Sequence, residues 1–166
     1  MKIAHTDAYQ VFDSRGNPTL EAEVVLEDGT PGRGTVPSGA STGQFEALEL
    51  RDGDPARFGG RSVFRAIGHV REQIGPHIRG MDAGDQEAVD RAMVELDGTP
   101  SRWRLGANAI LGVSMAVAGA AARARGLPLY AHLSDGAGDL LPLPEVQIVG
   151  GGAHARRRID VQDFLY

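Results

Sequence analysis

Apolar and polar residues alternate along the first part of the chain in the way that is typical of half-buried strands. Two runs, Ile3 to Phe12 and Thr19 to Leu26, carry alternating β-branched and polar residues. Asp28 and Gly29 form a strong tight-turn signal ahead of Thr35-Val36. The pattern therefore predicts an antiparallel meander of three strands.

After the meander, the apolar spacing changes to a helical period. Four apolar residues, three or four positions apart, lie on one helical stripe: Val63, Ile67, Val70 and Ile74. The Gly75-Pro76 pair is expected to weaken or end this helix. Ahead of it, Glu46 and Glu49 are expected on a short helical stretch, as surface charges.

A second helix is predicted after Asp82 and Asp85, whose carboxylates can cap free amides, and it ends at Gly98. Its apolar face consists of Val89, Met93 and Leu96. A third helix, from Leu105 to Arg125, is rich in Ala, Gly and Ser, which would let another element approach closely. Its least polar run is too short to span a bilayer, so no membrane association is predicted.

Strands followed by helices predict an α+β domain, with helices on one face of an antiparallel sheet. This domain is expected at residues 1–133, and a Gly-rich linker follows at 134–142. The remaining segment, 143–166, carries two further predicted strands, at 144–149 and 159–165. Because the chain stops inside the second of them, we expect that further sequence follows in the complete protein.

Composition narrows the classes of function. Of 166 residues, 42% are hydrophobic, which is enough for a folded core. The net charge of −5, from 22 acidic and 17 basic residues, argues against a general nucleic-acid binder. The absence of cysteine excludes disulfides and thiolate chemistry, and no signal-peptide pattern is visible, which is compatible with the cytoplasm. The only lysine is Lys2, so this segment has no internal lysine base.

Two glycine-rich loops couple permissive backbone to a few polar side chains, as expected where a chain approaches a metal, phosphate or carboxylate. They are residues 36–43 (VPSGASTG) and 150–155 (GGGAHA). Together with 13–18 (DSRGNP) and 105–112 (LGANAILG), they closely resemble the enolase family. The resemblance extends from Val11 to Phe164, whereas a complete enolase is more than twice as long.

The resemblance implies a capping domain followed by the first strands of an α/β barrel. It also implies a glycolytic lyase, phosphopyruvate hydratase, which uses Mg²⁺ to dehydrate 2-phosphoglycerate to phosphoenolpyruvate. The enzyme is expected to be cytoplasmic and a homodimer or larger homo-oligomer, with Arg15 near the dimer contact or serving only as a turn residue. Its lysine base, first Mg²⁺ ligands and phosphate-binding groups lie on later strands, so this segment alone is predicted to be inactive.

Four residues match the family's site. Ser41 corresponds to a serine that reaches the second Mg²⁺, for which a hydroxyl oxygen is a suitable ligand. His154 corresponds to a histidine that closes over the substrate phosphate and acts near the leaving hydroxyl. Gln162, eight residues later, corresponds to a glutamine that places the substrate. Asp163 stands where the family has a glutamate that takes part in proton transfer.

Three departures from the family pattern cluster at this site. Asp163 is one methylene shorter than glutamate, and catalytic geometry tolerates little misplacement. Gly150 replaces an asparagine, and Arg156, Arg157 and Arg158 follow the histidine. Arg156 and Arg157 are predicted to bind an oxyanion of the substrate, since guanidinium groups pair bidentately with such groups. An ordinary solvated loop is the equally weighted alternative.

Two other functions remain open from the sequence. One is an enolase-fold paralogue that acts on another phospho- or phosphono-carboxylate, motivated by the arginine run and Asp163. The other is a stand-alone capping domain that catalyses nothing and docks a protein partner along the strand that ends at Leu165.

Overall fold

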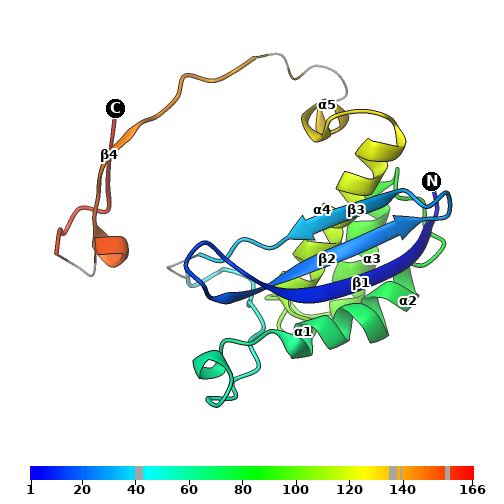
Figure 1. Cartoon of the computed structure of the whole chain (residues 1–166), viewed down its shortest axis with the longest axis horizontal. Coiled ribbons are helices and arrows are strands. Elements are labelled where there is room, and N and C mark those ends of the chain that lie inside the picture. The colour runs from blue at the N-terminus through cyan, green and yellow to red at the C-terminus, as the bar shows by residue number, and fades with distance from the viewer. Residues whose placement is uncertain (40–42, 135–137, 139, 156–157) are drawn as a thin grey trace.

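The computed structural model describes all residues except 40–42, 135–137, 139 and 156–157, and for residues 153 and 154 it describes only the backbone. A three-stranded antiparallel sheet opens the chain, in the order β1 (Ile3–Phe12), β2 (Pro18–Leu26) and β3 (Pro31–Thr35). The predicted meander and the α+β class are confirmed (Figure 1). The third strand, however, begins before the Thr35-Val36 signal. The sequence did not predict this start, because the residues PGRGT show no alternation of apolar and polar positions.

The long helix α4 (Ala107–Ala124) packs against β2 and β3 and forms the centre of the core. Within the described helices, it alone is long and apolar enough to be considered as a membrane span, with a mean hydropathy of 1.3. Its position accounts for that composition, since 56% of it is buried inside the protein. Figure 1 shows the sheet lying across this helix.

The glycines of β3 allow this packing. A Cβ on Gly32 would lie 2.2 Å from the Ala116 carbonyl oxygen and 2.3 Å from the Ala120 nitrogen, both backbone atoms of α4. A Cβ on Gly34 would lie 2.5 Å from the Gly112 carbonyl oxygen. Strand and helix backbones therefore touch directly, as the small residues of the third predicted helix suggested.

One helical run covers the apolar stripe at 63–74. It consists of α1 (Phe64–His69), a π-helical turn, η2 (Val70–Ile74), and α2 (Gly75–Ile78). The pair Gly75-Pro76, expected to weaken or end the helix, does not end it, because the helical run continues to Ile78. The wide π turn places Pro76 in the first turn of α2, where a proline needs no N–H donor.

Helix α3 (Gln86–Asp97) begins and ends as the sequence predicts. The Asp85 carboxylate accepts a hydrogen bond from the Ala88 N–H at 3.1 Å, and Gly98 ends the helix at φ 69°. Asp82 instead accepts a bond from Gly84 within the preceding turn. Two short helices were not predicted: η1 (Phe58–Gly60) and α5 (Leu129–Leu133), which follows Pro128.

The expected helical stretch at Glu46 to Glu49 is wrong. This segment forms no helix, and its backbone is bonded to distant parts of the chain instead. The Leu48 N–H donates to the Ser101 carbonyl at 2.7 Å, and the Leu48 carbonyl accepts from Ala107 at 2.8 Å. These long-range bonds take the place of the local bonds that a helix requires.

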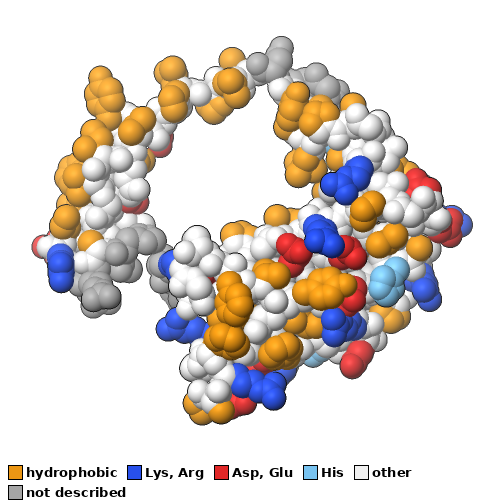
Figure 2. All heavy atoms as spheres, in the orientation of Figure 1, with side chains coloured by type: hydrophobic (Ala, Val, Ile, Leu, Met, Phe, Trp, Pro, Cys, Tyr) orange, Lys and Arg blue, Asp and Glu red, His pale blue; other side chains and the backbone are white. Residues whose placement is uncertain are grey.

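The C-terminal segment forms a separate hairpin, joined to the body by an extended connection (Figure 1). Strands β4 (Gln147–Gly150) and β5 (Asp163–Leu165) pair antiparallel, with a 3₁₀ turn, η3 (Gly152–Ala155), between them. Both predicted strands are present but shorter. Hydrophobic side chains follow one another along this segment in Figure 2, and Leu140, Leu141 and Leu143 are 89–94% exposed.

The contact between β3 and α4 predicts that Gly32→Ala destabilises the protein. Its methyl group would meet only backbone atoms, so the two elements must separate, at a cost of about 1–3 kcal/mol in the free energy of unfolding. Gly68→Ala, in α1, is the control, because no atom lies within 4 Å of its Cβ and alanine favours a helix. Urea unfolding measures both variants, and wild-type stability in Gly32→Ala would contradict this packing.

Candidate functional site

The first glycine-rich loop leaves the sheet at the end of β3. The Val36 N–H donates to the Leu20 carbonyl at 2.8 Å, and the buried Thr19 hydroxyl donates to the Val36 carbonyl at 2.8 Å. Residue 36 is therefore held to β2 from both sides of its peptide backbone. The position at which the loop departs is set by the sheet.

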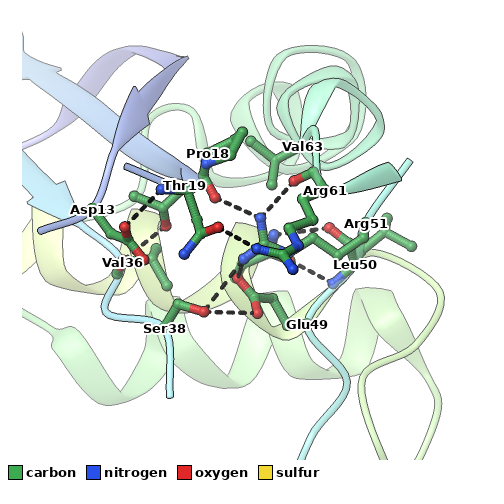
Figure 3. A network of polar contacts seen from close by, with 12 residues as sticks. Asp13, Pro18, Thr19, Val36, Ser38, Glu49, Leu50, Arg51, Arg61 and Val63 are labelled. Carbon is green, nitrogen blue, oxygen red and sulfur yellow. Dashed lines mark hydrogen bonds and ion pairs between the residues drawn. The ribbon is translucent and has the colours of Figure 1, made fainter. Parts of the chain in front are cut away.

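Two residues later, Ser38 is anchored by three hydrogen bonds. Figure 3 shows its hydroxyl bonded to Glu49 and Arg51. The guanidinium of Arg15 donates to the Ser38 carbonyl at 2.6 Å. The Ser38 hydroxyl donates to the Glu49 carboxylate at 3.2 Å and accepts from Arg51 at 3.3 Å. Both the backbone and the side chain of Ser38 are thus held.

Arg51 is the hub of this network. Its guanidinium donates to the Pro18 carbonyl at 2.5 Å, to the Arg61 carbonyl at 2.6 Å and to Glu49 at 2.5 Å. The Arg51 and Glu49 side chains are only 23% and 34% exposed. The arginine therefore joins the start of β2, the segment before α1 and the loop through one planar group, as Figure 3 shows.

Arg15 is itself oriented by a tight turn. The Asp13 carboxylate accepts hydrogen bonds from the backbone N–H groups of Arg15 and Asn17, each at 2.8 Å. The bond from Asn17, followed by that from Arg15, holds the pKa of Asp13 below its ordinary value although desolvation opposes the shift. The two bonds fix the turn that carries Arg15.

These side chains line an open pocket of about 360 Å³, formed by Arg15, Asn17, Ser38, Gly39, Arg51 and Arg61. Its arginines are already engaged by carbonyl oxygens, by Glu49 and by the Asn17 side chain. These arginines therefore have a structural role: they hold the start of the first glycine-rich loop in place.

Sequence reasoning missed most of this network. Glu49 was expected to be a surface charge, and this is wrong, because it is partly buried between Ser38 and Arg51. Glu46 is exposed as expected and accepts from the Gly43 N–H at 2.6 Å. Arg51 and Arg61 were not singled out, since an arginine in a loop carries no pattern that distinguishes a hub from a solvated charge.

Asn108 fastens the segment that carries Glu49 and Arg51. Its buried amide accepts from the Leu50 N–H and donates to the Leu50 carbonyl, both at 3.1 Å. Because Asn108 lies in the first turn of α4, the helix at the centre of the core also positions this segment.

The second glycine-rich loop lies in the C-terminal hairpin. The Gly151 N–H donates to the Gln162 carbonyl at 2.5 Å, and the Gly152 N–H donates to the Ile159 carbonyl at 2.9 Å. A Cβ on Gly151 would lie 2.0 Å from the Val161 carbonyl oxygen, so only glycine fits. This close crossing brings the turn η3, which includes the His154 backbone, beside Gln162.

Asp163 is exposed at the start of β5, and its carboxylate accepts a hydrogen bond from the Gln147 side chain in β4. Gln147 was not identified from the sequence, because its contact with Asp163 depends on how the two strands pair. The side chain of His154 lies outside the described part of the structure, as do Ser41, Arg156 and Arg157. Their predicted roles therefore stay predictions.

The described residues contain no group of three His, Asp or Glu side chains that could hold a metal ion. A single hydroxyl such as that of Ser41 cannot replace the several oxygen ligands that Mg²⁺ takes. The described residues therefore do not fit a complete Mg²⁺ site.

We predict that Asn108→Ala loosens the segment that carries Glu49 and Arg51. The change leaves the Leu50 N–H and carbonyl without partners, at a cost of about 2–4 kcal/mol in the free energy of unfolding. Amide hydrogen exchange at Leu50 should also quicken. Leu111→Ala, on an exposed part of the same helix, should change neither quantity by a comparable amount, and equal protection of Leu50 in Asn108→Ala would refute the clamp.

Comparison with known proteins identifies the family. The family described as "Enolase, N-terminal domain" matches residues 3–133. The chain is 57% identical over 164 residues to Enolase 1 of Desulfitobacterium hafniense (strain Y51), covering 99% of this chain and 37% of that relative. The chain thus spans little more than a third of the length of that relative. It belongs to the enolase family, whose N-terminal domain it contains.

Proposed function

We propose that this chain is the N-terminal part of an enolase that dehydrates 2-phosphoglycerate to phosphoenolpyruvate. The observation that carries the proposal is the 57% identity to an enolase over 164 residues, an alignment that covers 99% of the chain. In this proposal residues 1–133 form the capping domain, 134–142 the linker and 143–166 the first strands of a barrel. The end of α5 at Leu133 and the separate hairpin support this division.

Within such an enzyme, three residues of the hairpin bind the substrate or transfer protons to and from it. His154 is assigned to contact with the substrate phosphate and to proton transfer at the departing hydroxyl, since histidine is the residue type whose side chain can gain or lose a proton near neutral pH. Gln162 orients the substrate, and its neighbour Asp163 handles a proton around the leaving water. The base that takes the proton next to the carboxylate comes from elsewhere, since the only lysine of the chain is Lys2.

The reaction is proposed to require Mg²⁺. Ser41 would supply one oxygen ligand, and the carboxylate ligands would come from later parts of the enzyme. When bound, the metal supplies positive charge that makes a proton beside an ionised carboxylate more acidic. A cytoplasmic homodimer, or a larger homo-oligomer, completes the proposal.

The exposed apolar residues of the C-terminal segment support a larger assembly. Three leucines of this segment are almost fully exposed: Leu140, Leu141 and Leu143. Exposed apolar stretches of this kind mark surfaces that pack against another part of a protein or against a partner. The remainder of the enzyme would cover them. In the alternative of a stand-alone capping domain, a protein partner would cover them, and the intact mass of the protein from its source, about 17.6 kDa or more than twice that, separates the two.

We predict that the complete enzyme converts 2-phosphoglycerate to phosphoenolpyruvate, whereas the 166-residue chain does not. Removal of divalent metal by a chelator should abolish turnover, and added Mg²⁺ should restore it. The ultraviolet absorbance of the enol product follows the reaction. A complete enzyme that is folded, loaded with Mg²⁺ and inactive on 2-phosphoglycerate would refute the proposal.

A second function is favoured by Asp163, whose carboxylate is one methylene shorter than glutamate and is bound by Gln147. The complete enzyme could act on a phosphono-carboxylate instead of 2-phosphoglycerate. We then predict a higher kcat/KM for the phosphonate analogue, and a shift toward 2-phosphoglycerate in Asp163→Glu. Efficient ordinary enolase kinetics in the wild type would exclude this alternative.

A further inference from the structure

We propose that Ser38, Glu49 and Arg51 form a positioning unit for the first glycine-rich loop. The unit holds the chain just before Ser41 at a fixed place relative to the sheet, and so sets the affinity of the enzyme for its substrate. The inference rests on the proposed function. It adds three residues that act by positioning the loop that carries Ser41.

The first argument is the hydrogen bonding of the Ser38 hydroxyl. A serine hydroxyl has one donor and two acceptor positions. Here it donates to Glu49 at 3.2 Å and accepts from Arg51 at 3.3 Å. Its rotation is fixed by groups on both sides, while the carbonyl of the same residue accepts from Arg15 at 2.6 Å.

The second argument is that Arg51, which donates to the Ser38 hydroxyl, is itself held by the body of the protein. Arg51 is bonded to the Pro18 and Arg61 carbonyls, which belong to the start of β2 and the segment before α1. A guanidinium presents its donors in one rigid plane, so these bonds fix the direction of the remaining donor toward Ser38. The loop is thereby tied to regular structure, and Figure 3 shows the side chains converging from these elements.

The third argument is that the link can be removed separately from its support. Glu49 and Arg51 form their own ion pair at 2.5 Å, partly shielded from water. Removing the Ser38 hydroxyl leaves this pair, and its bonds to the body, in place. Ser38→Ala therefore removes the side-chain link to Glu49 and Arg51, keeps the bond from Arg15 to the residue 38 carbonyl, and does not unfold the network.

The test uses the complete enzyme with 2-phosphoglycerate as substrate. Ser38→Ala should raise KM roughly tenfold, because the hydrogen bonds lost are worth about 1 kcal/mol or slightly more, and should lower kcat much less. The melting temperature should stay near that of the wild type, and amide exchange at Gly39 should quicken. Ser38→Thr restores the hydroxyl and should return KM toward the wild-type value.

Two further variants make the test specific. Arg51→Lys keeps the charge but loses the planar donors, and should raise KM in the same way. Ser134→Ala is the matched control, since within the described part of the chain its hydroxyl donates to the Ala131 carbonyl in α5 and lies outside the Ser38 network. It should change neither KM nor exchange at Gly39.

The outcomes separate the inference from the proposed function. If the wild type turns over 2-phosphoglycerate and Ser38→Ala leaves KM and Gly39 exchange unchanged, the positioning unit is refuted and the function stands. A loss that Ser38→Thr does not restore also refutes it. If the wild type does not act on 2-phosphoglycerate, the function fails, and with it the inferred effect on substrate affinity, whatever the exchange at Gly39.

Discussion

The direct contact between the backbones of β3 and α4 is the constraint on which the rest of the body depends. Gly32 and Gly34 bring the strand onto Ala116, Ala120 and the turn at Gly112, at distances that no side chain on the strand would permit. This contact places the end of β3, and therefore Val36 at the start of the first loop, against the helix. The same helix begins with Asn108, which holds Leu50. The packing of β3 on α4 thus positions both segments that meet at Ser38: the loop after β3 and the segment that carries Glu49 and Arg51.

Beside Ser38, the charged side chains of Arg51 and Glu49 stabilise the local structure. Arg51 and Glu49 are partly buried, and a partly buried pair is stable only when its hydrogen-bonding groups are satisfied. Carbonyl groups of Pro18 and Arg61 and the Ser38 hydroxyl satisfy them here. The network therefore combines regular structure, which supplies the carbonyls, with a loop that supplies a single hydroxyl.

The hairpin is held together by different interactions from those of the body. Its strands are held by backbone pairing and by the close crossing of Gly151 over Val161, yet its apolar side chains face solvent. Local geometry is thus sufficient to bring the turn η3 beside Gln162. Burial of the apolar residues requires contacts beyond those of the hairpin itself, in keeping with the 37% of the enolase relative that the chain covers.

The sequence by itself determined the elements whose signals are local. The alternation at 3–26, the stripe at 63–74, the cap at Asp85 and the stop at Gly98 each depend on neighbours within a few residues, and each is found in the structure. Its motifs also pointed to the enolase family and to the site residues, although the roles of Ser41, His154, Arg156 and Arg157 remain predictions.

Only the tertiary structure decided the features that depend on distant partners. The strand PGRGT has no apolar pattern, and it is a strand because it pairs with β2 along one edge and packs against α4. Glu49 was expected on an exposed helix and instead lies in a hydrogen-bonded network, because Ser38 becomes its neighbour only when the chain folds and because the Pro18 and Arg61 carbonyls hold Arg51 beside it. Gln147 meets Asp163 for the same reason. Local periodicity records how a segment turns, whereas long-range contacts record which segments meet, and a single sequence carries little direct information about the latter.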